Sequence, residues 1–469
     1  MTKLLGLISI SLFLTTCCYG LDDPYPIIPI LVETDELPGD NGNVFLIHSV
    51  AINDTGETLV HLRNSIFNAA TDEVLVQNGE IVVREGLTGF LNAPQDAFVK
   101  GFDAISISNS GKRAQNLFVG PFPFEQDSGV YRDNDLLILE SEFSTAVDLA
   151  AGTPFLEFRD TKINNSDKLL VVATVDQPTN DNEAERLIMI VDGDNQQIVA
   201  KEGDLLPGQS GPIRDIEIGH SGSAFNDNDD VMFVTDVNFV ESIYINNTLI
   251  AKEGLPSPIE NRTYVGIGES VDMNNHGDYV FKANLSGDFD TNSVIIKNGE
   301  IFKQEGDPGP GGFQFTSFGS VSGPIKIGNE GSVLWYGEWD DPNAATDSGL
   351  FLNDMLLVQE GVSYVNGLEV DLLHDTAGKF SLSSNGEWII FKAELDDSFG
   401  FLLNGAFAIH LSSSISGDIN CDGAVDLLDV QPFVDLLSGG VFSGKADING
   451  DGKLNLLDVG PFVELLNGG

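Results

Sequence analysis

The chain is poor in cysteine and in basic residues, and these two shortages limit what it can be. Its 469 residues include 3 Cys, and 23 Lys and Arg stand against 72 Asp and Glu, a formal net charge of −49. A surface this acidic repels phosphate backbones and anionic membranes, which argues against nucleic acid as a partner. Only Cys421 lies beyond residue 20, so an exported form of the chain would have no intramolecular disulfide.

Long apolar runs are also missing, except at the start of the chain. Lys3 precedes an apolar run over residues 4–14, and small or polar residues follow up to Gly20. A run of about eleven residues is too short to span a bilayer and is typical of a secretory signal peptide. We therefore expect residues 1–20 to be a signal peptide and the protein to be secreted or held at the cell surface. Acylation of Cys17 would instead make it a lipoprotein, although Thr16 stands where such signals usually carry Gly, Ala or Ser.

Hydrophobic residues make up 42% of the chain, enough for a large core, and their pattern repeats. A four-residue polar turn followed by an apolar strand recurs seven times. The turns occupy residues 53–56, 108–111, 164–167, 226–229, 274–277, 328–331 and 383–386. Their fourth residues lie 55, 56, 62, 48, 54 and 55 positions apart, a regular period that indicates a repeat architecture.

Each repeat also contains a second hairpin signal. Asn-Gly separates two apolar strands at residues 78–79 and 298–299, and weaker versions occur at residues 246–247, 353–354 and 404–405. Asn-Gly favours a two-residue β-hairpin because both central residues of its turn need positive φ. Two hairpins give about four antiparallel strands per repeat. The sequence therefore predicts a mainly β fold, with a seven-bladed β-propeller-like domain over residues 21–411.

A segment before the first repeat suggests how the ring closes. Residues 28–40 are similar to residues 198–208, which end the third repeat. An N-terminal strand lent to the last blade would join the two ends of the ring. The seventh repeat also offers a final strand of its own at residues 406–411, so the lent strand either adds to that blade or replaces one of its strands. The turn pattern resembles the tandem NxxGxxAF repeats of secreted bacterial proteins, a resemblance that informs architecture and not chemistry.

Two near-copies of an acidic loop follow, after a linker at residues 412–417, within residues 418–440 and 447–469. Each places oxygen-bearing side chains at loop positions 1, 3, 5, 9 and 12, with Gly at position 6 and a main-chain carbonyl at position 7. The expected ligands are Asp418, Asn420, Asp422, Ala424, Asp426 and Asp429 in the first loop, and Asp447, Asn449, Asp451, Lys453, Asn455 and Asp458 in the second. Hard oxygen ligands at this spacing are those of an EF-hand loop, so we expect two calcium ions.

This segment resembles a type I dockerin. Position 12 is Asp where paired EF-hands carry Glu, and each loop leads into one apolar helix pattern with no helix before it. The resemblance implies a small α-helical module over residues 418–469 and a cohesin-like or cell-surface protein partner. Positions 10 and 11 carry Leu427-Leu428 and Leu456-Leu457, whereas cohesin-binding dockerins often have hydroxyl residues there. Docking of the two helices against each other or onto the propeller is the alternative.

Catalytic motifs are not evident. The 6 His show no metal-ligand spacing along the chain. Glutamates that precede a Gly recur at one point of the repeat, as Glu85, Glu202, Glu253, Glu305 and Glu360. Glycosidases use a pair of carboxylates to hydrolyse their substrates. A catalytic pair would not be repeated five times, so we expect these glutamates to have a structural role in turns.

We therefore expect a secreted calcium-binding protein in which a propeller-like binding or scaffold domain is attached to a partner or surface assembly through a dockerin-like tail. No catalytic residue is predicted. The alternative is a propeller-type carbohydrate-active enzyme, a glycosidase or lyase, that the tail directs to polysaccharide.

Overall fold

The computed structural model describes residues 25–39, 42–68, 71–121, 127–176, 184–217, 219–397, 400–411, 416–417, 419, 425–439, 446, 448–449 and 454–466. The expected signal peptide lies outside these ranges. Within them, no helix combines the length and the apolar character needed to cross a membrane.

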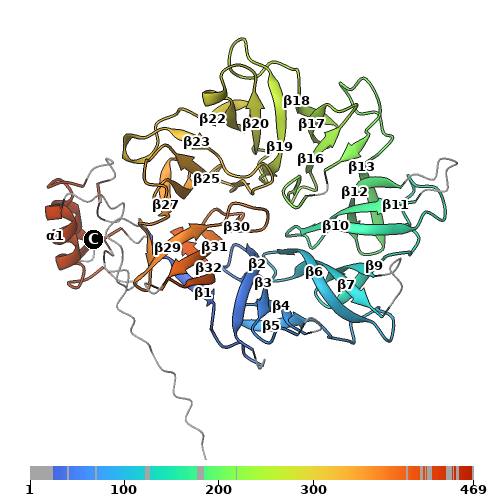
Figure 1. The fold of residues 1–469 in the computed structure, drawn as a ribbon, viewed down its shortest axis with the longest axis horizontal. Helices are drawn as coiled ribbons and strands as arrows, with labels where there is room; N and C mark the ends of the chain where they lie inside the picture. The colour runs from blue at the N-terminus through green and yellow to red at the C-terminus, as the bar shows by residue number, and fades with distance from the viewer. Residues whose placement is uncertain are drawn as a thin grey trace, which may run out of the picture.

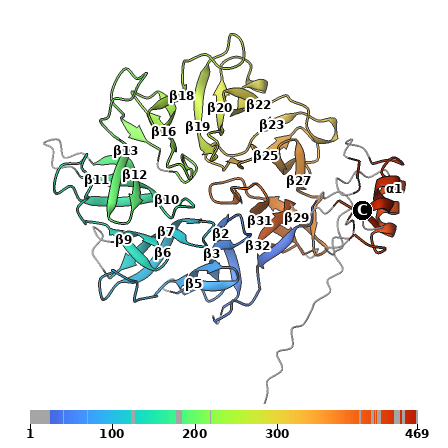
Figure 2. The same ribbon diagram turned by 180° about the vertical axis from the view of Figure 1, so that it is seen from behind.

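Seven antiparallel sheets surround a central axis and form a β-propeller, which confirms the fold predicted for this part of the chain (Figures 1 and 2). The inner strands of each blade line the central pocket, and the other strands of the sheet lie further out. Middle strands such as β11, with the sequence LLVVATV, are buried along nearly their whole length. A continuous apolar run fits this position because a neighbouring blade covers each face of the sheet.

The first three blades are continuous four-stranded sheets: β2 (Val44–Ile52), β3 (Thr58–Asn64), β4 (Glu73–Gln77) and β5 (Glu80–Arg84); β6 (Phe98–Ile107), β7 (Arg113–Gly120), β8 (Ser128–Arg132) and β9 (Asp135–Leu139); β10 (Phe155–Ile163), β11 (Leu169–Val175), β12 (Glu185–Asp192) and β13 (Asn195–Lys201). Blade four contains β14 (Asp215–Ile216), β15 (Ser223–Phe225), β16 (Val231–Asp236), β17 (Glu241–Ile245) and β18 (Thr248–Lys252). Blade five contains β19 (Tyr264–Met273), β20 (Tyr279–Leu285), β21 (Ser293–Lys297) and β22 (Glu300–Gln304), with the 3-10 helix η2 (Phe289–Thr291).

Blade six follows the short helix η3 (Pro310–Gly312) and contains β23 (Phe315–Ser317), β24 (Lys326–Ile327), β25 (Val333–Trp339), β26 (Ser348–Leu352) and β27 (Met355–Gln359). Blade seven contains β28 (Tyr364–Val365), β29 (Leu368–Leu373), β30 (Phe380–Leu382), β31 (Trp388–Asp396), β32 (Leu402–His410) and, from the other end of the chain, β1 (Ile28–Val32).

The repeated polar turns join each blade to the next by hydrogen bonds. In the first turn, the Asn53 side-chain oxygen accepts the amides of Thr55 and Glu57, while its nitrogen donates to the Ser108 carbonyl of the next blade, 2.8 Å away. Asn164, Asn226 and Asn274 repeat this arrangement. The Asn of each such turn therefore both shapes its own turn and ties two blades together.

The second residue of each turn completes a ring of bonds. Its main-chain N–H donates to the side-chain oxygen of the second residue in the next turn, over 2.7–3.0 Å, along the series Asp54, Asn109, Asn165, Asp227, Asn275 and Asn329. The ring closes through the seventh turn, where Asn329 donates to the Ser384 carbonyl and Asn385 donates to Asp54. The seven turns thus form one continuous hydrogen-bonded circle.

The N-terminal strand β1 supplies the outermost strand of blade seven. It pairs antiparallel with β32, with Leu31 opposite Ala406. Pro29 is tolerated because an outer strand has a free edge. The prediction that Asn404-Gly405 forms a hairpin turn is wrong: both residues lie inside β32, the third strand of the blade, because the fourth strand comes from the N-terminus. The lent strand therefore supplies the missing fourth strand.

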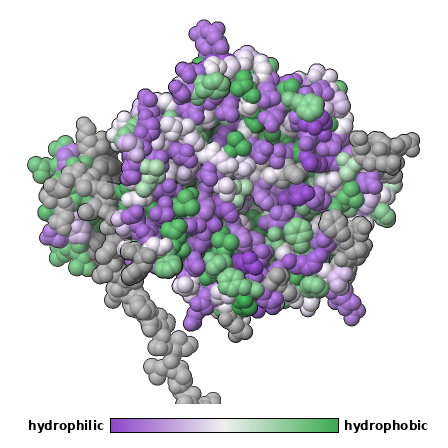
Figure 3. Space-filling model, in the orientation of Figure 1, coloured by the Kyte–Doolittle hydropathy of each residue, from purple (hydrophilic) through white to green (hydrophobic). Residues whose placement is uncertain are grey.

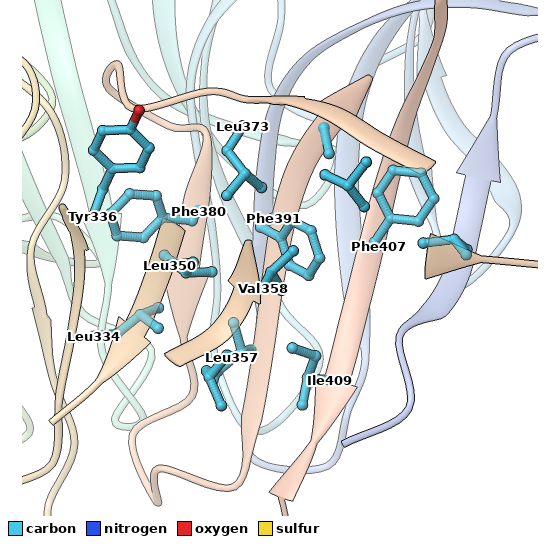
Figure 4. Packing of buried hydrophobic residues seen from close by; sticks show 14 of the residues in the cluster. Leu334, Tyr336, Leu350, Leu357, Val358, Leu373, Phe380, Phe391, Phe407 and Ile409 are labelled. Carbon is cyan, nitrogen blue, oxygen red and sulfur yellow. The ribbon is translucent and has the colours of Figure 1, made fainter. Parts of the chain in front are cut away.

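Apolar side chains fill the spaces between blades. Figure 4 shows one such space, in which Leu334 and Leu350 of blade six belong to the same apolar cluster as Phe391 and Phe407 of blade seven. All four side chains are at most 1% exposed. On the face of the propeller in Figure 3, hydrophilic residues predominate and apolar residues occur in small groups.

Two helices follow the propeller, α1 (Val430–Gly439) and α2 (Val459–Leu466), each directly after position 12 of an acidic loop. Phe433 and Phe462 stack with ring centroids 4.2 Å apart and form, with Ala446, the centre of a small separate core. The two helices therefore pack against each other, as one alternative expected. Figures 1 and 2 place α1 outside the ring, on the side of blade seven.

Candidate functional site

The inner strands enclose a pocket of about 540 Å³ on the propeller axis. This volume lies within the range of small-molecule sites. Its wall is rich in titratable side chains: His48, His61, Glu73, Asp103, Asp160, Lys162, His220, Asp272, Lys326 and Lys379. Such a wall suits a hydrophilic ligand with several hydrogen-bonding groups, and it is the candidate binding site of the propeller.

His220 lies between two aspartates from other blades. Its Nε2 is 3.3 Å from Asp103 Oδ1, and its Nδ1 is 3.4 Å from Asp160 Oδ1. Burial lowers the pKa of His220, but the hydrogen bonds to Asp103 and Asp160 outweigh burial and raise the pKa to about 10. At neutral pH His220 is therefore a cation that donates from both ring nitrogens.

Two buried aspartates in the pocket have pKa values that are shifted in opposite directions. Burial raises the pKa of Asp160, but Lys162 and His220 outweigh burial and hold it below its usual value. Burial raises the pKa of Asp272 above its usual value, although Lys326, with its Nζ 3.8 Å from Asp272 Oδ1, opposes the rise. Carboxyl groups whose environments separate their pKa values are what general acid and base catalysis uses.

A second cluster lies on blade one, where His48, His61 and Glu73 come together. His61 Nε2 is 3.3 Å from Glu73 Oε2, and His48 Nε2 is 4.0 Å from Glu73 Oε1. Burial and the neighbouring His61 lower the pKa of His48 to about 4, so this imidazole is neutral at neutral pH. The hydrogen bond with His61 lowers the pKa of Glu73 and favours its carboxylate form.

The structure describes five of the twelve expected calcium ligands: Asp426, Asp429, Asn449, Asn455 and Asp458. The other seven, Asp418, Asn420, Asp422, Ala424, Asp447, Asp451 and Lys453, lie outside the described residues. The carboxylate at position 12 is fully buried in both loops and accepts the amide of position 9 over 2.9 Å. Asp458 also accepts the amide of Asn449 at position 3 over 3.2 Å, which draws the two ends of that loop together.

The repeated glutamates hold strands together at the rim. Glu253 and Glu305 each accept the amide of the residue twelve positions earlier, at the start of the third strand of the blade. Glu85 accepts two such amides, and Glu360 accepts the Ser348 hydroxyl and the Leu373 amide. Of the described residues that line the central pocket, none is one of these glutamates, and the contacts of Glu85, Glu253, Glu305 and Glu360 agree with the structural role predicted for them.

Neither cluster in the pocket is predicted from the sequence. The repeat of glutamates before Gly does not include Glu140 either, because Ser141 follows it, yet Glu140 accepts the amide and the hydroxyl of Ser128 as the rim glutamates do. His48 and His61 are separated by a turn in the sequence and meet only because their strands pair. Alternation along β2 and β3 could have placed the two histidines near one another, but not Glu73, which lies on β4.

Comparisons with known proteins give no activity for this chain. A model of a family of unknown function, DUF7453, matches residues 20–242. No curated protein matches. Matching solved structures include a protein of unknown function from Dyadobacter fermentans, with 10% identity, a TM-score of 0.28, and coverage of 83% of this chain and 97% of that one.

Two further matches carry names. One is a puromycin-hydrolysing peptidase from Mycobacterium tuberculosis, with 10% identity, a TM-score of 0.40, and coverage of 84% of this chain and 55% of that one. The other is a subtype N11 neuraminidase-like protein of A/flat-faced bat/Peru, with 9% identity, a TM-score of 0.34, and coverage of 84% and 97%. At these values the likenesses say nothing about what this chain binds.

Proposed function

We propose that this is a secreted binding or scaffold protein, in which the pocket and loops of the propeller bind a hydrophilic ligand and a calcium-stabilised C-terminal tail attaches the molecule to a partner. The observation that carries the calcium part is the complete burial of Asp429 and Asp458. A carboxylate removed from water needs a cation or several hydrogen-bond donors to compensate for the lost solvation. Both residues stand at position 12 of a loop with calcium-ligand spacing.

Charge explains why the tail would need the ion. Four carboxylates fall at ligand positions of the first loop, at 418, 422, 426 and 429, and three in the second, at 447, 451 and 458. Without a cation these groups repel one another, and the small core around Phe433 and Phe462 offers little to oppose them. Calcium binding is therefore coupled to folding of the tail, and the first loop, with more carboxylates, binds more tightly.

Isothermal titration calorimetry of the full chain, stripped of metal and titrated with calcium, tests this proposal. We expect two ions per chain, and one ion for each of the variants Asp429→Asn and Asp458→Asn. Glu464→Gln, which removes a charge from α2 outside both loops, is the matched control and should leave two. An unchanged stoichiometry in both loop variants would contradict the proposal.

The attachment surface that we propose lies on the exposed ends of the loops. Leu427 and Leu456 are 81% and 79% exposed, and the neighbouring Leu428 and Leu457 are exposed too. Isolated leucines need no explanation, but two equivalent pairs beside two calcium loops favour a protein partner with apolar pockets, of the cohesin-like or cell-surface type. A secreted protein would meet both calcium and partners of this kind.

A second function is favoured by the two pocket aspartates. Asp160 has a lowered pKa and Asp272 a raised pKa, a combination that a carbohydrate-active enzyme could use. A screen of acidic and neutral polysaccharides against the full chain separates the two functions. Product release that Asp160→Asn and Asp272→Asn each abolish would establish the enzyme, whereas ligand binding without product release supports the binding protein.

A further inference from the structure

The strongest unexplained feature of the pocket is the cluster of His48, His61 and Glu73. The donor atoms of these three side chains all lie within 4.8 Å of one another. A hydrogen-bonded histidine–carboxylate pair accounts for His61 and Glu73 but not for the third member. The Nε2 atom of His48 is buried, and it has no hydrogen-bond partner among the described residues.

The backbone of blade one builds this cluster on three neighbouring strands. Ser49 of β2 is opposite His61 of β3, and the register shifts between Ile47 and Ser49. This irregularity leaves His48 without a cross-strand partner, and its ring meets that of His61 with centroids 4.7 Å apart. Glu73 is the first residue of β4, two positions before the partner of His61. Paired strands hold ligands more firmly than loops do.

Two imidazoles and one carboxylate form a donor set of transition-metal sites that keep coordination positions open. A tetrahedral ion with bonds of about 2.0–2.2 Å keeps its donors roughly 3.4 Å apart, so small side-chain rotations would bring this cluster into bonding geometry. We propose that His48, His61 and Glu73 bind one divalent transition-metal ion of the zinc or ferrous class on the wall of the central pocket. Its open positions face the cavity and accept an oxygen of a hydrophilic ligand.

Two of the nearby cations have other partners. Lys379 donates its ammonium to the main-chain carbonyl of His48, and Arg63 forms an ion pair with Asp72 over 2.6 Å. Phe102 covers one side of His61, with ring centroids 4.8 Å apart, which limits access of water from the neighbouring blade. The site is independent of the proposed calcium tail, since the residues of each lie in different parts of the fold.

The test uses the untagged full chain, stripped of metal and then saturated with calcium so that the tail loops are occupied. Co²⁺ is added and followed by its visible absorption, and Zn²⁺ by calorimetry. We expect one ion per chain, with affinity falling at least about 100-fold in both His48→Ala and Glu73→Gln, since removing a ligand costs more than removing its supporting residues. His374→Asn, which changes a histidine that pairs with Glu394 and does not line the pocket, is the control and should bind as the native chain does.

Thermal unfolding of the metal-free variants establishes that they fold. If His48→Ala unfolds, Glu73→Gln, which keeps the shape of the side chain, decides the question. Absence of Co²⁺ and Zn²⁺ binding overturns the proposal, as does binding that Glu73→Gln leaves unchanged. Equal loss of binding in His374→Asn would show that the loss does not depend on this cluster and overturns the proposal too.

Discussion

Single residues at the turns decide how the blades meet. The fourth residue of each turn has positive φ, which Gly adopts freely and which Asp167 and Asp229 adopt at 61° and 65°. Both aspartates have compensating contacts, since Lys112 pairs with Asp167 over 2.6 Å and Lys168 pairs with Asp229. At these two turns the Asp adopts positive φ less easily than Gly would, but it gains an ion pair with a lysine.

Gly56 combines positive φ with a close neighbour. A Cβ there would lie 2.7 Å from the ring of Trp388, whereas Gly277, at nearly the same φ, has nothing within 4 Å. We expect Gly277→Ala to lower the free energy of unfolding by about 1 to 2 kcal/mol because of its backbone alone. Gly56→Ala should cost a further 1 to 3 kcal/mol, roughly, because Trp388 must move. Urea unfolding at fixed calcium measures both, and equal losses would show that the contact with Trp388 is unimportant.

Glu140 makes stability depend on pH. Burial raises the pKa of Glu140 to about 7, although its bonds with Ser128 oppose the rise. In the unfolded chain this group ionises near its usual pKa of 4.5, so its contribution is full below that pH and falls as the pH rises through 7. Relative to Glu140→Gln, the native chain should lose about 2 to 3 kcal/mol of unfolding free energy between pH 5 and pH 8.5.

Denaturant unfolding across this range measures the difference for Glu140, because the overall charge of the molecule affects both proteins almost equally. The exposed Glu300→Gln serves as the control and should show a flat difference from the native chain. A flat profile for Glu140→Gln as well would mean that the buried carboxylate ionises as easily in the folded protein as in the unfolded one.

At the scale of elements, the ring is closed by one short strand. Leu31 of β1 is 6% exposed and packs with residues of blades one and seven, while Ile28 of the same strand is 36% exposed. We expect Leu31→Ala to lower the free energy of unfolding by about 2 to 5 kcal/mol, as for other buried leucines. Ile28→Ala should change it by less than about 1 kcal/mol. Equal effects in urea unfolding would indicate that β1 does not seal the ring.

For the whole molecule, the separate cores of the tail and the propeller predict separate unfolding. The apolar clusters of the described residues group Phe433 and Phe462 only with residues beyond the propeller. Scanning calorimetry should therefore show two transitions, and chelation of calcium should lower or remove only the smaller one. Asp458→Asn should reproduce part of this effect, and the propeller variant Leu31→Ala should shift only the larger transition. A single transition that chelator moves as a whole would contradict the independence of the two parts.

Local alternation, turn chemistry and a regular period are enough to predict most of the strands, the number of blades and five of the rim glutamates. The turn predicted at Asn404-Gly405 does not form, because this segment pairs with a strand from the other end of the chain. The spacing of the acidic loops still predicts two calcium ions, a local property that the chain encodes in twelve residues.

The contents of the pocket depend on contacts between residues that are far apart in the sequence. His48 and Glu73 lie 25 positions apart, and His220 meets Asp103 from a blade more than 100 residues away in the sequence. These contacts form because seven inner strands are arranged around one axis, and no short sequence motif predicts that arrangement. The Asn or Asp at the second position of the first six turns shows the same limit, because its side-chain oxygen accepts an amide of the preceding blade and has that partner only when the blades form a ring.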